Sequence, residues 1–406
     1  MDEPLAPASP RAEHDTVASA VPVLNLRIAL LGAAGFLVAV SWQFVTPVLP
    51  VYLANIGYSA STIGILASLL SLTMGLVESD IGRIAAALGQ RSALVAGLVV
   101  NAAAMAWIVL ARTVWGVAGG MVGVGASRAT IWSPLHASVA ATASEETRGR
   151  AFGVFWTLTS VAFLTGPAIG AYVAERFGAP AAFYLGGTVS LVTVAVVFAI
   201  TDPQSPAARA PASTSWDVLR NPIVVRLCLV NHFYNAISAI WSTFLPLYMA
   251  RQGLSVVTIG WLFTVQGLTY ALVQIPTGRV ADRIGPERLL LPGLLGRGAM
   301  VLFVPLMHSA GPLLAAAAIF GFCGGTVPVT FTMLVARFSS RDQYTSAMGV
   351  YNASSDLGFF IGPLVGGAAA LLGLSGPFFL ALPMVVAGTL IARSCRDAIV
   401  RAERAE

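Results

Sequence analysis

Twelve long apolar segments run through this chain, and they constrain its fold more than any other feature of the sequence. Most of them reach the ~20 residues that an α-helix needs to cross the hydrocarbon core of a bilayer. The segments cover residues 27–53, 60–80, 92–111, 116–139, 150–175, 181–201, 223–250, 257–277, 289–308, 312–335, 345–372 and 376–394. Because backbone groups in lipid must be hydrogen-bonded within their own segment, the sequence predicts an all-α membrane protein with twelve transmembrane helices.

The composition agrees with this prediction and excludes several classes of partner. Hydrophobic residues make up 57% of the chain and charged residues only 10%, whereas a soluble domain carries about 25% charged residues. All 23 basic residues are arginine, and they are spread over short loops, so we expect no nucleic-acid partner. The cysteines Cys228, Cys323 and Cys395 lie in or beside apolar segments without the spacing of metal ligands, and no metal site is predicted.

The distribution of arginine predicts the orientation in the membrane. With the amino terminus placed inside the cell, 18 arginines fall on the inner side and three on the outer side. Cytoplasmic loops are enriched in basic residues, so we expect both termini in the cytoplasm and a multi-pass protein of the cell (inner or plasma) membrane. Residues 1–26 lack the basic and apolar regions of a signal peptide and are predicted to be a disordered cytoplasmic tail.

An internal repeat with a constant offset of 196 residues relates the two halves of the chain. Matching pairs without any gap include 49–52 with 245–248, 62–64 with 258–260, 153–154 with 349–350, and 166–167 with 362–363. Parallel repeats of this kind are the plan of secondary transporters that bind substrate between two halves. We therefore expect six-helix bundles at 27–201 and 223–395, a flexible cytoplasmic linker at 202–222 and a cytoplasmic tail at 396–406.

A short arginine-containing motif lies between the eighth and ninth segments. It reads Gly278-Arg279-Val280-Ala281-Asp282-Arg283-Ile284-Gly285, and its repeat counterpart reads Gly82-Arg83-Ile84-Ala85-Ala86-Ala87-Leu88-Gly89. Glycines allow a tight turn, and an aspartate that pairs with an arginine across the seam between the halves would latch one conformation. Only the second copy holds both partners, so we expect disruption there to disturb switching more than changes at Ala86 or Ala87.

Small residues and a proline recur at the same spacing in the fifth and eleventh segments. The matching positions are Gly166-Pro167 with Gly170, and Gly362-Pro363 with Gly366. Small residues four apart let helices pack closely, and an interior proline removes a hydrogen bond and bends the helix. We expect a packing seam with a kink on both helices.

The twelve-segment plan, the motif at 278–285 and this glycine pattern together resemble the major facilitator superfamily over residues 27–395. The motif is similar to the signature of that family, although its usual first-half site has Ala86 and Ala87 in place of Asp and Arg. The pattern in the fifth segment is similar to the motif of the superfamily's antiporters, which are mostly exporters. The resemblance implies alternating access, with substrate held between helices 1, 4, 7 and 10 and contributions from helices 2, 5, 8 and 11.

Three ionisable residues are candidates for proton coupling. Arg128 and Asp356 lie near the middle of the fourth and eleventh segments, and Glu78 lies near the end of the second. Placing a charge at the centre of a membrane helix costs about 2.5–3.5 kcal/mol. We therefore expect each of these charged residues to have a structural or functional role. A carboxylate whose surroundings change between conformations can bind a proton in one and release it in the other. Structural pairing stays an alternative for Arg128 and Asp356, as does a solvated helix end for Glu78.

The substrate-contacting residues are predicted from polar and aromatic positions inside the segments. The seventh segment is the most polar, and a lipid-facing surface would not carry so many polar groups. The predicted set is Trp42, Gln43, Arg128, Trp132, Tyr234, Asn235, Ser238, Trp241, Gln266, Tyr270 and Asn352. Aromatic walls with scattered hydrogen-bonding groups suit an uncharged or amphipathic organic compound. Arg297 is interpreted instead as a packing or snorkelling residue, because the family resemblance makes the ninth helix an outer support.

These observations predict proton-coupled export, by antiport, of drug-like or metabolite compounds by a monomer in the lipid bilayer. The sequence has no nucleophile elbow, phosphate-binding loop or metal-ligand cluster, so we expect neither an enzyme nor a cofactor. Two alternatives stay open. One is a proton-coupled uptake symporter for a small neutral nutrient, and the other is a non-transporting membrane sensor or scaffold of the same fold.

Overall fold

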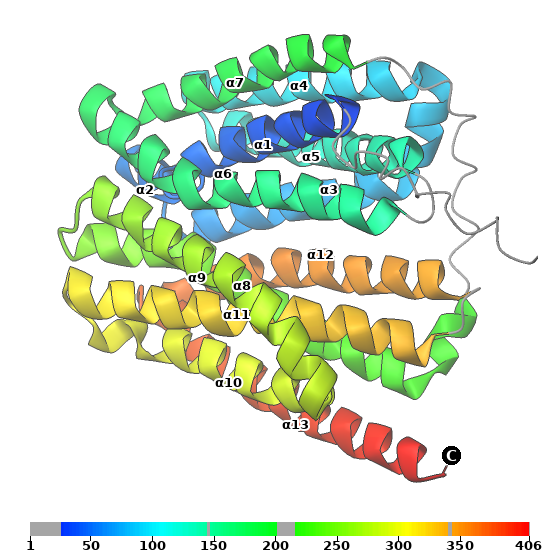
Figure 1. The fold of residues 1–406 in the computed structure, drawn as a ribbon. Coiled ribbons are helices and arrows are strands. Elements are labelled where there is room, and N and C mark those ends of the chain that lie inside the picture. The colour runs from blue at the N-terminus through cyan, green and yellow to red at the C-terminus, as the bar shows by residue number, and fades with distance from the viewer. Residues whose placement is uncertain (1–25, 144–146, 201–215, 340–342, 406) are drawn as a thin grey trace, which may run out of the picture.

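The computed structural model describes residues 26–143, 147–200, 216–339 and 343–405, and nearly all of them are helical (Figure 1). The predicted tail at 1–26 and most of the predicted linker lie outside these ranges. In chain order the helices are α1 (Leu26–Val45), α2 (Leu49–Asn55), α3 (Ala60–Leu88), α4 (Gln90–Leu110), α5 (Val114–Thr142), α6 (Arg148–Phe177), α7 (Ala179–Ala199), α8 (Pro222–Arg251), α9 (Val256–Ile284), α10 (Glu287–Phe303), α11 (Ala310–Phe338), α12 (Tyr344–Ala369) and α13 (Gly376–Ala405). Short 3₁₀ helices are η1 (Trp216–Arg220), η2 (Val304–Leu306) and η3 (Ala370–Leu372).

The predicted all-α membrane architecture is confirmed. Within the described residues, 11 helical spans are long and apolar enough to cross a membrane, with α1 and α2 forming one span. The remaining long helix, α5, has 29 residues and carries Arg128 together with several glycines, which lower its hydropathy. Large apolar side chains such as Trp115 and Leu272 are exposed on the outside. In a bilayer such a surface faces lipid.

The helices form two six-span halves that lie side by side, α1–α7 above and α8–α13 below in Figure 1. The repeat predicted from the sequence is visible in the packing, since α1 packs on α6 and α7 just as α8 packs on α12 and α13. The first and last described helices begin and end on the same side of the bundle. We call this side the termini end and the opposite side the far end.

The first span differs from its repeat counterpart by a break in the helix. α1 ends at Val45 and α2 begins at Leu49, with Pro47 in the turn between them and Pro50 in the first turn of α2. Prolines donate no backbone hydrogen bond and disrupt a helix interior. The counterpart of Pro47 in α8 is Thr243, and α8 continues unbroken over 30 residues with Pro246 inside it. One extra proline thus separates α1 from α2.

The two halves meet at the far end through two equivalent glycine–proline contacts. A Cβ added to Gly64 of α3 would overlap the carbonyl oxygen of Pro363 in α12, and one added to Gly260 of α9 would lie 2.7 Å from the carbonyl oxygen of Pro167 in α6. The offset of 196 residues relates Gly64 to Gly260 and Pro167 to Pro363. The sequence repeat therefore builds both seams between the halves from the same pair of residues.

The four glycines of the predicted packing pattern face helices of their own half. Gly166 and Gly170 of α6 pack against α1, and Gly362 and Gly366 of α12 pack against α8. A Cβ at Gly362, for example, would overlap the backbone of Ala236. α6 and α12 thus contact both halves. Their glycines pack against a helix of their own half, and their proline carbonyl packs against a helix of the other half.

The motif at 278–285 is helical up to Ile284, so the tight turn expected from its glycines is confined to its last residue. α9 continues to Ile284 and α3 continues to Leu88, so only the last glycine of each copy turns the chain. Gly285 and Gly89 have φ of +90° and +81°, a conformation that glycine adopts without steric cost. Asp282 therefore lies in the last turn of α9 and not beside a helix N-terminus.

The predicted latch is not engaged in this conformation. The side chains of Arg279, Asp282 and Arg283 are exposed, and none forms an ion pair with another described residue. The first half has a local pair instead, Arg83 Nη1 to Asp80 Oδ1 at 2.8 Å within α3. Exposed pairs of this kind contribute little to stability. The predicted tail at 396–406 continues α13, which is helical up to Ala405.

Candidate substrate cavity

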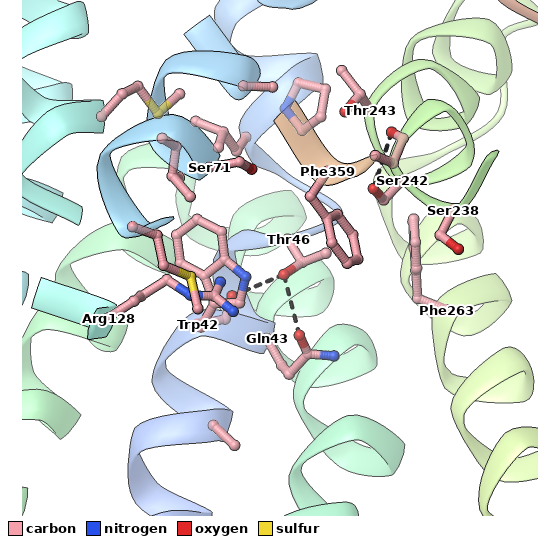
Figure 2. Close-up of a pocket in the computed structure, with 18 of the residues that line it drawn as sticks. Trp42, Gln43, Thr46, Ser71, Arg128, Ser238, Ser242, Thr243, Phe263 and Phe359 are labelled. Carbon is pink, nitrogen blue, oxygen red and sulfur yellow. Dashed lines mark hydrogen bonds between the residues drawn. The ribbon is translucent and has the colours of Figure 1, made fainter. Parts of the chain in front are cut away.

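A cavity of about 430 Å³ lies between the two halves (Figure 2). Its walls come from α1, α2, α3, α4, α5 and α6 of the first half and from α8, α9, α10 and α12 of the second. The volume is in the range of small-molecule sites, which are mostly apolar with a few polar groups. The expected contribution of the tenth span, α11, is missing from the lining of the described cavity. Gly321, Gly324 and Gly325 bring α11 close to α9 at this level and offer no side chain.

Seven of the residues predicted from the sequence line the cavity. They are Trp42, Gln43, Arg128, Trp132, Ser238, Gln266 and Asp356. Figure 2 shows Arg128 beside Trp42, with the arginine Cζ 4.8 Å from the centre of the indole ring. The Thr46 hydroxyl lies within hydrogen-bond distance of the Trp42 carbonyl, at 3.1 Å, and of Gln43 Oε1, at 3.2 Å. These bonds fix the wall at the point where α1 ends.

Three residues predicted on the cavity face of α8 are placed elsewhere, which corrects their expected position. Tyr234 donates to the Gly324 carbonyl at 2.8 Å, and Asn235 donates to the Asn231 carbonyl at 2.9 Å. Trp241 is fully buried and stacks on Phe320, with ring centres 4.1 Å apart. α8 is enclosed by helices on several sides, so a polar face can be satisfied by helix packing and need not face a cavity.

Three further predicted residues also lie outside the cavity lining. Tyr270 of α9 packs against the glycines of α11. Asn352 is exposed on α12, one turn from Asp356 toward the termini end. Glu78 of α3 is half-buried, and its carboxylate faces Ser133 of α5. Of these three, Glu78 keeps a link to the cavity, because it interacts electrostatically with Asp356.

The three predicted coupling residues are brought together from three helices. Asp356 lies in the seam between the halves. A Cβ added to Gly75 of α3 would lie 3.6 Å from the Cβ of Asp356. Its carboxylate is within electrostatic range of both Glu78 and Arg128. Neither carboxylate forms an ion pair with Arg128 in this conformation, within the described part of the chain. A guanidinium and a carboxylate thus face one cavity from opposite halves, which suits exchange of a proton.

The third and ninth spans reach the cavity, contrary to their expected role as outer supports. Asn101 of α4 and Arg297 of α10 both line it, and the offset of 196 residues relates the two positions. Asn101 is held by the Ser190 and Ser127 hydroxyls at 2.7 and 3.2 Å. Arg297 is only 5% exposed and packs against Phe320 and Tyr234, so of its two interpretations packing is retained and snorkelling is wrong. Gly324 of the neighbouring α11 gives Arg297 room to enter, since a Cβ there would overlap its Nη1.

Sequence reasoning missed the aromatic walls on the second half. Phe263 of α9 and Phe359 of α12 line the cavity, together with Phe163 of α6. Phenylalanines are ordinary residues in an apolar helix, so composition gave no reason to select them. The repeat held a usable signal, because Phe163 and Phe359 occupy equivalent positions in a chain where most apolar pairs differ.

The cavity is closed at the far end, and the halves stand apart at the termini end. The far end is sealed by the two glycine–proline seams and by a hydrogen bond from the Val257 amide of α9 to Glu175 Oε2 of α6, at 3.0 Å. At the termini end, a Cβ on Gly153, Gly278 or Gly349 would meet no atom of the described residues within 4 Å. These glycines lie on α6, α9 and α12, which also form the far-end seams. The two halves therefore separate along these helices toward the termini end.

Two six-span repeats around one central cavity, with the same seam built twice, are the plan of a multi-span membrane transporter. The chain belongs to the Major Facilitator Superfamily, whose sequence profile matches residues 31–258 and again residues 227–398. The predicted resemblance is thereby confirmed.

The relatives of this chain include proteins named for drug resistance. The chain is 27% identical over 361 residues to a multi-drug resistance efflux pump PmrA homolog of Lactococcus lactis, covering 85% of this chain and 88% of the relative. It is 26% identical over 395 residues to the multidrug resistance protein MdtG of Escherichia coli, covering 90% and 92%. Solved structures share the fold. The nucleoside transporter NupG has a TM-score of 0.76 at 13% identity, covering 92% of this chain and 98% of its own. A bacterial homolog of the lysosomal transporter Spinster, in an inward-facing conformation, has 0.73 at 14%, covering 93% and 94%.

Proposed function

We propose that this transporter exports drug-like or metabolite compounds across the cell (inner) membrane in exchange for protons. The observation that carries the proposal is the placement of Asp356 and Arg128 on opposite walls of one cavity that is sealed at the far end. One relative named above is a homolog of a multi-drug resistance efflux pump, and the other is a multidrug resistance protein, which favours export over uptake.

We assign the termini end to the cytoplasm, because it carries most of the arginines. With this orientation the conformation described here is open to the cytoplasm and closed to the outside. A cytoplasmic compound can then enter the cavity directly. In the opposite conformation the seams of Gly64 and Gly260 separate, and the compound leaves on the outer side.

Proton exchange is assigned to Asp356, with Arg128 and Glu78 as the groups that govern it. A nearby guanidinium stabilises the charged form of a carboxylate, while burial and a second carboxylate favour the protonated form. The balance at Asp356 depends on how far α12 stands from α3 and α5, and this distance changes as the halves rock. Asp356 can therefore release its proton to the cytoplasm as substrate binds, and take up another from the outside after substrate leaves.

The chemistry of the walls fits an amphipathic organic substrate. Trp42, Phe263 and Phe359 present flat apolar surfaces, while Gln43 and Gln266 present amide groups (Figure 2 labels the first four). Aromatic surfaces bind many ring systems with little geometric demand, which suits a transporter with several substrates. We propose that it acts as a monomer, since one chain contains both halves of the cavity.

Dye accumulation in an efflux-deficient bacterial host tests the direction of transport. Cells that express the protein are expected to accumulate less ethidium than cells that express the Asp356→Asn variant at the same level. Adding a proton ionophore should remove the difference, because export would lose its energy source. Higher accumulation in cells with the unaltered protein would overturn export and favour the uptake alternative.

A further inference from the structure

Arg297 is a buried cation at the wall of the cavity that no described carboxylate neutralises. Its Nη1 donates to the Tyr234 hydroxyl at 3.1 Å, and its Nη2 donates to the Ser238 hydroxyl at 2.8 Å. Its guanidinium lies between two rings, with Cζ 3.8 Å from the centre of Phe320 and 4.5 Å from that of Tyr234. Its Nε is buried and has no hydrogen-bond partner among the described residues. These neighbours accommodate a positive charge, but none of them balances it.

The repeat shows that this cation takes the place of Arg128 in the second half. The residue equivalent to Arg128 is Gly324, and a Cβ on Gly324 would overlap Arg297 Nη1. The guanidinium of Arg297, coming from α10, therefore fills the space into which a side chain at 324 would point. Each half thus presents one guanidinium to the cavity at an equivalent level, from a different helix in each case.

The neighbours of the two cations are also related by the repeat. Arg128 lies over Trp42, and Arg297 donates to Ser238, which is the residue equivalent to Trp42. The replacement of an indole by a hydroxyl leaves more room beside Arg297. The two guanidinium groups are therefore not interchangeable, since Arg128 lies over an aromatic ring of α1 and Arg297 donates to a hydroxyl of α8.

The charges that line the cavity do not cancel. Among the described residues, the lining contains the two arginines and a single carboxylate, Asp356. That carboxylate interacts electrostatically with Arg128, and the groups that interact with Arg297 are Tyr234, Tyr270 and Cys323. A buried charge without a partner is costly, so a bound ligand that supplies a negative charge beside Arg297 would be favoured.

Gln266 adds a hydrogen-bond donor on the same wall. Its Oε1 accepts from Trp241 Nε1 at 2.9 Å. An indole nitrogen can only donate, so the amide oxygen must face Trp241 and the amide NH₂ is left for another acceptor. Ser238 offers no further donor, because its hydroxyl already donates to the Tyr234 carbonyl at 2.6 Å.

We propose that Arg297 and Gln266 form an oxyanion subsite in the second half of the cavity, which binds the carboxylate, sulfonate or phosphonate group of an amphipathic substrate. Arginine is suited to this role, because its planar N–H groups match the oxygens of such anions. The apolar body of the substrate then lies on Phe263 and Phe359. The inference rests on the proposed function, since it names the substrate class for the same cavity.

Two fluorescent compounds of nearly equal shape test the subsite. Dansylate carries a naphthalene sulfonate, and dansylamide carries an uncharged sulfonamide in its place. The full chain in phosphatidylcholine nanodiscs is titrated with each compound, and energy transfer from tryptophan to the dansyl group is measured, with empty nanodiscs subtracted. A hydrogen bond to a charged group contributes about 1.5–3 kcal/mol, so the unaltered protein is expected to bind dansylate roughly 10- to 150-fold more tightly than dansylamide.

The variant Arg297→Gln is expected to lose this preference, so that the two compounds bind within about threefold of each other. The matched control is Arg288→Gln, an exposed arginine on the same helix, which should keep the preference. Gln266→Leu should reduce it in part and keep dansylamide binding. If Arg297→Gln does not fold, the preference for dansylate over dansylamide in the unaltered protein and in Gln266→Leu still tests the subsite.

Equal binding of both compounds by the unaltered protein would overturn the subsite. So would an unchanged preference in folded Arg297→Gln, or in Gln266→Leu. The assay uses no pH gradient, so its outcome is separate from that of the dye-export test. Selective sulfonate binding without export would refute the proposed function alone, and export without sulfonate preference would refute the subsite alone.

Discussion

The far-end seam leads to the sharpest prediction about conformational change. Gly64 on α3 and its neighbours on α12 belong to opposite halves, and the contact is between backbones. A Cβ at Gly64 would overlap the Pro363 carbonyl and lie 2.9 Å from the Gly367 Cα. Backbone atoms of two packed helices cannot rotate away as a flexible side chain can. Gly64→Ala must therefore force the halves apart at the far end. The substitution raises the free energy of the conformation described here, in which the far end is closed.

The size of the effect follows from the cost of overpacking. Inserting a methyl group into a packed seam costs about 1–3 kcal/mol, which corresponds to a shift of roughly 5- to 150-fold in the ratio of the two conformations. Alanine also favours a helix by about 1 kcal/mol over glycine. This gain is the same in both conformations, so it raises thermal stability without changing their ratio.

Cysteine labelling from outside the cell measures the population that is open at the far end. The three native cysteines are replaced by alanine, and a reporter cysteine is placed at Ser242, which lines the cavity. A membrane-impermeant maleimide reaches this cysteine only when the far end opens. Gly64→Ala is expected to raise the labelling rate at least fivefold, the lower limit of the estimate above.

A matched substitution at the other end of the molecule serves as the control. Gly349 lies on α12 at the termini end, where a Cβ would meet no described atom within 4 Å. Gly349→Ala should leave the labelling rate unchanged or lower it, because any crowding there would occur only in the opposite conformation. An unchanged rate in Gly64→Ala, in protein that still transports, would refute the role assigned to the seam.

Two further predictions use the same labelling assay. Glu175→Gln keeps the hydrogen bond to the Val257 amide but removes a charge at the start of α9, which is worth at most about 1 kcal/mol at an exposed site. We expect the labelling rate to rise at most fivefold. A lower labelling rate would show that the charge does not favour closure of the far end. Asp282→Asn should lower labelling and slow transport more than Ala87→Asn does, since the latch can act only in the opposite conformation. Equal effects of the last two variants would contradict the assignment of the latch to the second half.

The architecture was predictable because both of its determinants are written in the chain. The length of the apolar segments fixes the helices, and the offset of 196 residues fixes the pairing of the halves. The repeat also marked Gly64 with Gly260 and Pro167 with Pro363, although it did not show that these pairs touch across the halves. That contact depends on the tilt of α3 and α9, which local sequence does not determine.

The candidate site was predictable only in part, for a physical reason. A polar side chain inside a membrane helix must be satisfied, but either a cavity or a neighbouring helix can satisfy it. Gln43 and Gln266 face the cavity, whereas Asn235 and Tyr234 bond to neighbouring backbone carbonyls. The position of Arg297 at the cavity wall was not predicted. The space that its guanidinium fills is left by Gly324, which lies on another helix.

Transport by reconstituted protein tests the central claim, that Asp356 couples substrate export to proton movement. The unaltered protein and Asp356→Asn are placed in proteoliposomes with a fluorescent substrate found by the dye test. The account predicts that a pH gradient drives uphill transport by the unaltered protein. Asp356→Asn should show none, while still exchanging substrate across the membrane without a gradient. Full pH-driven transport by Asp356→Asn would contradict it.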